Sequence, residues 1–81
     1  MTNDIKRPEQ GKRLFAVQPA SWAKLDGYGC EYATNMGDAY EIAQRWVQEY
    51  NEDCIIWKIG TIQAMRWVRV SVGEVSYSAA N

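Results

Sequence analysis

The chain has 81 residues, of which 47% are hydrophobic and 12% aromatic, so its length predicts one domain with one modest core. No stretch approaches the roughly 20 consecutive apolar residues of a membrane span, and the polar N-terminus lacks the apolar run of a signal peptide. We therefore expect a cytoplasmic protein with no membrane contact. The absence of histidine removes the commonest general base and metal ligand, so we expect no enzyme activity, metal or cofactor.

The charges are distributed unevenly, although the formal net charge is −1. Residues 1–13 and residues 54–81 each carry a net charge of +2. Residues 26–53 contain seven acidic residues and one basic residue, which gives a net charge of −6. This acidic central block is the first candidate for a charged interaction surface.

The N-terminal segment, residues 1–11, is predicted to be a flexible arm. It has no hydrophobic periodicity, and it contains Pro8 and Gly11, which are typical of irregular structure. Residues 12–78 form the predicted single α+β domain, and residues 79–81 are a tail.

Two strands are predicted before the helix. Residues 13–18 have the apolar density of a strand, and Pro19 ends it. Residues 28–33 alternate between large and small or polar side chains, which predicts a second strand. Residues 20–27 connect the two, and Trp22 within them is expected to cover one end of the core.

The clearest predicted element is a helix from Asn35 to Tyr50. Its apolar residues recur at helical spacing, at Ala39, Ile42, Ala43, Trp46, Val47 and Tyr50. Asn35 is the expected N-cap, with Asp38 three residues later, and a cap at Asp38 followed by Glu41 is the alternative. Asn51 is expected to end the helix.

A hairpin is predicted after the helix. Residues 54–59 are rich in β-branched and aromatic side chains, which favour a strand. Residues 60–61 then suit a two-residue turn, with a return strand at residues 65–72 and a short tail strand at residues 74–77. The order strand, strand, helix, strand, strand predicts an α+β fold, with an antiparallel sheet of about four strands and one helix packed on one face.

The two-residue turn would place Trp57 and Trp67 on opposite faces of the sheet. One face would pack on the helix, and the other would expose an aromatic residue beside basic residues. Such a face could dock a partner or a second copy of the chain as a homodimer. The alternatives are a β-bulge that resets the register, or a tail that covers the face.

The two cysteines, Cys30 and Cys54, are 24 positions apart and fit no CxxC spacing. In a cytoplasmic protein we expect them to be buried thiols. A disulfide that joins the segments before and after the helix is the alternative.

The charged side of the helix is the leading candidate for a binding surface. The predicted partner-binding residues are Asp38, Tyr40, Glu41, Arg45, Gln48, Glu49 and Glu52. An acidic surface of this kind suits a basic groove on another protein. The alternative is a solubilising surface in which Arg45 pairs with Glu41 and Glu49 along the helix.

A basic and aromatic part of the hairpin is the alternative site. Its residues are Lys58, Arg66, Trp67 and Arg69, which could stack bases and neutralise phosphates. Three positive charges are few for phosphate-driven affinity.

The helical segment NMGDAYEIAQRWVQEYN and the Trp-rich segment CIIWKIGTIQAMRWVRV, in an acidic chain of this size without histidine, resemble small phage-encoded accessory proteins. Anti-CRISPR proteins are the best-known members. The resemblance covers size and organisation and includes no diagnostic motif, so it assigns no functional residue. It implies a non-catalytic inhibitor that binds a host protein complex, such as a CRISPR-Cas effector, and blocks its nucleic-acid-binding surface. The partner would be a host protein in the host cytoplasm, with no direct contact to nucleic acid. The alternative function is a small nucleic-acid-binding module.

Overall fold

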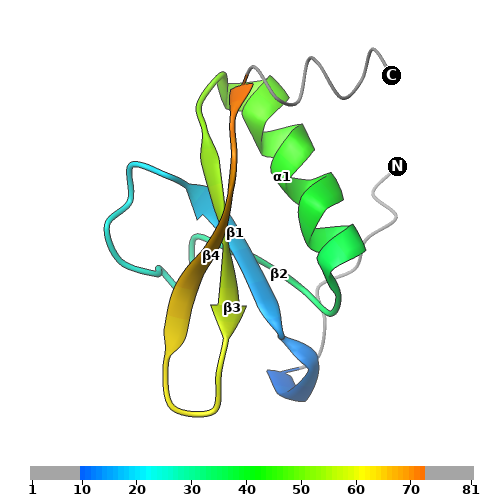
Figure 1. Ribbon diagram of the computed structural model, residues 1–81, viewed down its shortest axis with the longest axis vertical. Helices are drawn as coiled ribbons and strands as arrows, with labels where there is room; N and C mark the ends of the chain where they lie inside the picture. Colours follow the sequence, from blue (N-terminus) through cyan, green and yellow to red (C-terminus); the bar gives the residue numbers. More distant parts are fainter. Residues whose placement is uncertain (1–9, 73–81) are drawn as a thin grey trace.

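A four-stranded antiparallel sheet carries one α-helix on one face in the computed structural model, which describes residues 10–72 (Figure 1). The elements in chain order are the 3-10 helix η1 (Gln10–Lys12), β1 (Phe15–Pro19), β2 (Glu31–Ala33), α1 (Met36–Tyr50), β3 (Cys54–Ile59) and β4 (Ala64–Val70). The strands lie in the order β2-β1-β3-β4. The predicted α+β class and the order of strands and helix are therefore confirmed.

The helix α1 begins and ends where its capping residues predict. The side-chain Oδ1 of Asn35 accepts a hydrogen bond of 2.8 Å from the backbone N–H of Asp38, so Asn35 rather than Asp38 is the N-cap. Asn51 adopts the left-handed conformation with φ 56°, and its N–H donates to the carbonyl of Val47 at 2.8 Å. These two local bonds define the length of the helix.

The main core lies between α1 and the sheet. It consists of the buried residues Val17, Ala33, Ala39, Ile42, Ala43, Val47, Cys54, Ile56 and Val70. The predicted apolar face of the helix accounts for four of these residues. Trp46 is only partly buried and packs against the margin of this core, and Tyr50 is 57% exposed.

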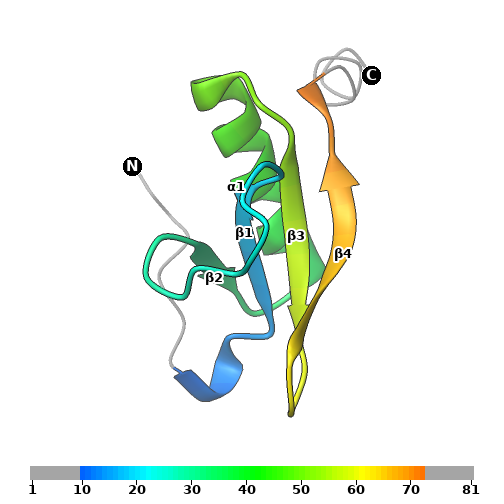
Figure 2. The same cartoon turned by 90° about the vertical axis from the view of Figure 1, so that its left-hand side faces the viewer.

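A second cluster covers the opposite face of the sheet. Ala16, Cys30, Ile55 and Trp57 are buried there. The segment 20–30 lies across this face, on the side away from α1 (Figure 2). The buried side chain of Gln18 holds the segment, because its amide donates to the carbonyl of Lys24 at 2.9 Å and accepts from the N–H of Asp26 at 3.0 Å.

The hairpin between β3 and β4 differs from the prediction. Ile59 pairs with Ala64, so the turn has four residues, 60–63, instead of two. A shift in register then follows, since Trp57 pairs with Arg66 whereas Ile56 pairs with Val68. Trp67 is thus the extra residue of a β-bulge, and the bulge alternative is confirmed.

The bulge and the covering segment settle the environment of the two hairpin tryptophans. Trp57 is 7% exposed in the second cluster, whereas Trp67 is 49% exposed. Trp67 shares the helix side of the sheet with Lys58, whose ammonium lies 4.6 Å from the centre of its ring. The two residues lie on opposite faces, as predicted. The face away from α1 does not expose Trp57, however, because the segment 20–30 covers it.

Several predicted boundaries move. The first strand begins at Phe15, and the second contains only Glu31–Ala33, because Gly29 lies in a turn closed onto the carbonyl of Asp26. The predicted tail strand at residues 74–77 lies outside the described residues. The predicted N-terminal arm also lies outside them, apart from its last two residues, which begin η1.

The cysteines are buried thiols, as expected. Cys54 belongs to the core beneath α1 and Cys30 to the cluster on the other face. The sheet separates them, so no disulfide joins them.

Candidate functional site

The outer face of α1 carries the centre of the predicted partner-binding surface. Glu41, Arg45 and Gln48 are three or four residues apart, so the helical repeat brings them to one side of α1. All three are exposed, as is Glu49. Within residues 10–72, the side chains of Glu41, Gln48 and Glu49 form no hydrogen bond or ion pair.

Arg45 does not pair along the helix with Glu41 or Glu49 in the described part of the chain. Its guanidinium bonds to Oε2 of Glu31 in β2 at 2.8 Å. The other oxygen of this carboxylate accepts a hydrogen bond of 2.6 Å from the indole N–H of Trp46. Arg45 therefore pairs with Glu31 of β2 instead of with Glu41 or Glu49. The strand β2 places Glu31 beside the consecutive helix residues Arg45 and Trp46.

The other predicted residues lie at the margins of this face. Tyr40 is 38% exposed and precedes Glu49 by nine residues, or two and a half helical turns, so the two point to opposite flanks of α1. Asp38 is partly buried at the first turn, where it is engaged with the N-cap. Glu52 follows the end of the helix. The structure therefore groups Glu41, Arg45, Gln48 and Glu49, since Glu49 is one helical turn from Arg45, and it separates the other three from this centre.

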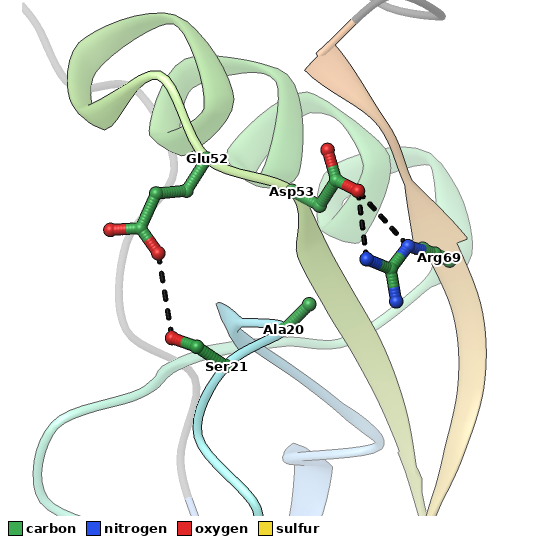
Figure 3. A pocket seen from close by; sticks show the side chains of 5 residues that line it. All are labelled: Ala20, Ser21, Glu52, Asp53 and Arg69. Carbon is green, nitrogen blue, oxygen red and sulfur yellow. Dashed lines mark hydrogen bonds and ion pairs between the residues drawn. The ribbon is translucent and has the colours of Figure 1, made fainter.

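Glu52 and its neighbour Asp53 line a polar pocket of about 350 Å³ (Figure 3). The lining residues come from the connection after β1, the connection between α1 and β3, and β4, and they are Ala20, Ser21, Glu52, Asp53 and Arg69. Two guanidinium nitrogens of Arg69 bond to Oδ2 of Asp53 at 3.0 and 2.8 Å. The backbone N–H of Val72 donates to Oδ1 at 3.0 Å.

These donors lower the pKa of the Asp53 carboxyl below its ordinary value, the backbone hydrogen bond from Val72 having the largest effect and the hydrogen bond from Arg69 the next. Asp53 is therefore ionised at neutral pH, and its oxygens are occupied by these donors. Its role in this geometry is to attach β4 to the start of β3.

The four residues of the alternative nucleic-acid site do not form one surface. They are Lys58, Arg66, Trp67 and Arg69. Lys58 and Trp67 stack on the helix side of the sheet. On the other side, the guanidinium of Arg66 bonds to two backbone carbonyls of the covering segment at 3.2 and 3.3 Å, and Arg69 bonds to Asp53. Both arginines are therefore already engaged by acceptors of the chain itself.

A pocket with aromatic walls lies near the end of α1, and the sequence did not predict it. It has a volume of about 360 Å³ and is lined by Pro19, Trp22, Gly29, Trp46, Tyr50 and Glu52. The rings of Trp22 and Trp46 meet at 82° with their centres 6.4 Å apart, and those of Trp46 and Tyr50 meet at 64° with centres 5.7 Å apart. The available sequence signal was the spacing of Trp46 and Tyr50 by one helical turn at the exposed end of the helix.

Residues 10–72 contain no group of three or more carboxylates and thiols placed to hold a metal ion. No described helix is long and apolar enough to cross a membrane. Comparison of the chain with protein-family models, curated proteins and solved structures found no match.

Proposed function

We propose that this protein is a small non-catalytic inhibitor that binds another protein through the outer face of α1. The observation that carries the proposal is the set of exposed polar side chains of Glu41, Gln48 and Glu49, which have no partner among the described residues. They stand on a helix that is capped at both ends and attached to β2 through Glu31. The backbone of this face is therefore already ordered, and binding has to order only the side chains that it carries.

The charge of this face indicates the class of partner. Glu41 and Glu49 place on it two negative charges that are unpaired among the described residues, and the positive charge of Arg45 is balanced by Glu31. A partner with a basic surface, such as a groove that normally holds nucleic acid, is electrostatically complementary to it. Together with the resemblance to anti-CRISPR proteins, this supports a phage-encoded inhibitor that blocks the nucleic-acid-binding surface of a host defence complex.

Direct binding of nucleic acid is the less favoured function. Its candidate residues are divided between the two faces of the sheet, and Arg66 and Arg69 are occupied by carbonyl and carboxylate acceptors. We expect no shift of single-stranded DNA or RNA in a gel titration at low salt, where phosphate contacts are strongest. A shift that weakens steeply with salt would instead favour this second function.

The test compares two variants that change the net charge equally. E41Q/E49Q removes two negative charges from α1, and T61K/Q63K adds two positive charges on the exposed turn between β3 and β4. Each variant is used as bait in an extract of the native host, and the affinity for the captured complex is then measured. We expect E41Q/E49Q to bind roughly tenfold more weakly or worse, and T61K/Q63K to bind as the wild type does. Equal affinity of E41Q/E49Q and wild type would overturn the proposal.

A further inference from the structure

The aromatic pocket at the end of α1 has the composition of a site for an organic cation. Trp22, Trp46 and Tyr50 supply three rings, and neighbouring rings meet at steep angles of 82° and 64°. The faces of such rings carry a partial negative charge, which attracts a cation placed within about 6 Å of the ring centre. The volume of about 360 Å³ is sufficient for the end of one long side chain.

The charged residue that lines the pocket is an acid. Arg66 and Arg45 adjoin the walls of the pocket from outside, where they are bonded to the carbonyl of Trp22 and to Glu31. Glu52 is exposed and lines the pocket, with only a long hydrogen bond of 3.4 Å from Ser21 to its Oε1. A second carboxylate stands at the wall formed by Gly29, because a Cβ on this glycine would lie 2.7 Å from Oδ2 of Asp26. No lysine or arginine lines the pocket. An incoming cation would therefore gain attraction from both carboxylates.

The walls of the pocket are held in position. The carboxylate of Glu31 fixes the Trp46 indole through its N–H. The backbone carbonyl of Trp22 accepts a hydrogen bond from Arg66 at 3.3 Å. At Gly29 the absence of a side chain keeps space beside the ring of Trp22, since a Cβ there would lie 3.2 Å from Cζ3 of that ring. A preformed site of this kind binds without a large ordering cost.

We propose that this pocket binds an arginine side chain of the partner protein. A guanidinium is planar and weakly hydrated, so it stacks on aromatic rings more readily than an ammonium does. It can also donate two hydrogen bonds to one carboxylate, here that of Glu52. The inference rests on the proposed function only in assuming that the arginine belongs to a partner protein. The affinity of the pocket for an arginine side chain can be measured without that partner.

The test uses a charged probe and its neutral isostere, Nα-acetyl-arginine methylamide and Nα-acetyl-citrulline methylamide. Both are titrated into ¹⁵N-labelled protein while the four indole N–H signals are followed by NMR. We expect the arginine derivative to shift the signals of Trp22 and Trp46 in a saturable manner. The signals of Trp57 and Trp67 should not move, and the citrulline derivative should have no saturable effect.

Matched variants locate the site. W22L keeps the backbone carbonyl that Arg66 binds, and W67L removes an exposed tryptophan from the other side of the sheet. E52Q neutralises the carboxylate that lines the pocket. We expect W22L and E52Q each to weaken binding of the arginine probe by about threefold or more, and the control W67L to leave it unchanged. Equal affinity for the citrulline derivative, or equal loss in W67L and W22L, would overturn the inference.

The two proposals fail separately. Absence of arginine binding, with partner binding still lost in E41Q/E49Q, overturns only the pocket inference. Unchanged partner binding in E41Q/E49Q, with the arginine titration as expected, overturns only the role of the outer helix face.

Discussion

Trp46 on α1 and Glu31 on β2 are joined by a hydrogen bond of 2.6 Å from the indole N–H to a carboxylate oxygen. The strand β2 has three residues, so it forms few ladder bonds of its own. Because the second oxygen of Glu31 accepts from Arg45, a single carboxylate attaches the helix to this short edge strand. The same bond positions one wall of the aromatic pocket.

We expect E31A to lower the free energy of unfolding by about 1–2 kcal/mol, because it removes a hydrogen bond to a charged group that is partly buried. R45A should cost less than about 1 kcal/mol, since its ion pair is exposed. E49A, a nearby control without a described partner, should change stability by less than about 0.5 kcal/mol. Urea unfolding followed by fluorescence measures all three. If R45A cost as much as E31A, the ion pair and not the indole bond would dominate.

The N-cap of α1 gives a second prediction. Replacing Asn35 by alanine removes the acceptor of the 2.8 Å bond from the N–H of Asp38, and we expect a loss of about 1 kcal/mol. Replacing the preceding residue, the exposed Thr34, should have little effect. Thermal unfolding by circular dichroism compares the two variants. Equal melting temperatures would mean that another group satisfies this N–H.

The elements predicted correctly are those specified by neighbouring residues. The helix follows from apolar spacing and from the caps at Asn35 and Asn51, all within one segment. The strand at residues 54–59 follows from a continuous run of strand-forming side chains, and its bounds are those predicted. Neighbouring residues decide the bounds of these two elements, so tertiary contacts do not alter them.

One error is local to the turn between β3 and β4, and the others arise where segments separated in the sequence decide the structure. Gly60 is compatible with a two-residue turn. Its N–H, however, donates to the carbonyl of Gln63 at 2.9 Å, which closes a four-residue turn over residues 60–63. Gln18 reads as the polar end of a strand, but it is buried because it binds a segment up to eight residues away. The partnership of Glu31 with Trp46 spans 15 residues. The aromatic pocket depends on that partnership and on Trp22, so residue spacing alone could not reveal it.

The tether at Gln18 is a third test of the fold. In Q18L the N–H of Asp26 and the carbonyl of Lys24 lose their partner, so the segment 20–30 should detach from the sheet more often. Lys24 is exposed, and its peptide bond should then be cut by trypsin several-fold faster, as measured by mass spectrometry. The control Q48L changes a glutamine on the outer face of α1. An unchanged rate in Q18L would show that the other contacts of the segment, including the bonds from Arg66 and the packing of Cys30, are sufficient to hold it.

The Cys54 thiol predicts a dependence of stability on alkaline pH. Burial, with a smaller contribution from the charges of Glu52 and Asp53, raises its pKa to about 11. An unfolded thiol has a pKa of about 8.5, so between about pH 8.5 and 11 the folded state holds this proton more tightly than the unfolded state does. The stabilisation is complete below this window and is lost as pH rises through it.

We therefore expect the wild type to lose about 1–2 kcal/mol more stability than C54A does between pH 8 and pH 10. Urea unfolding at several pH values gives the two slopes, and comparing slopes removes the constant cost of the cavity in C54A. C30A keeps the thiol of Cys54 in the core beneath α1 and should therefore retain its alkaline loss. Parallel curves for wild type and C54A would show that the Cys54 thiol does not cause the alkaline loss, because any titration of lysine and tyrosine side chains is common to both proteins.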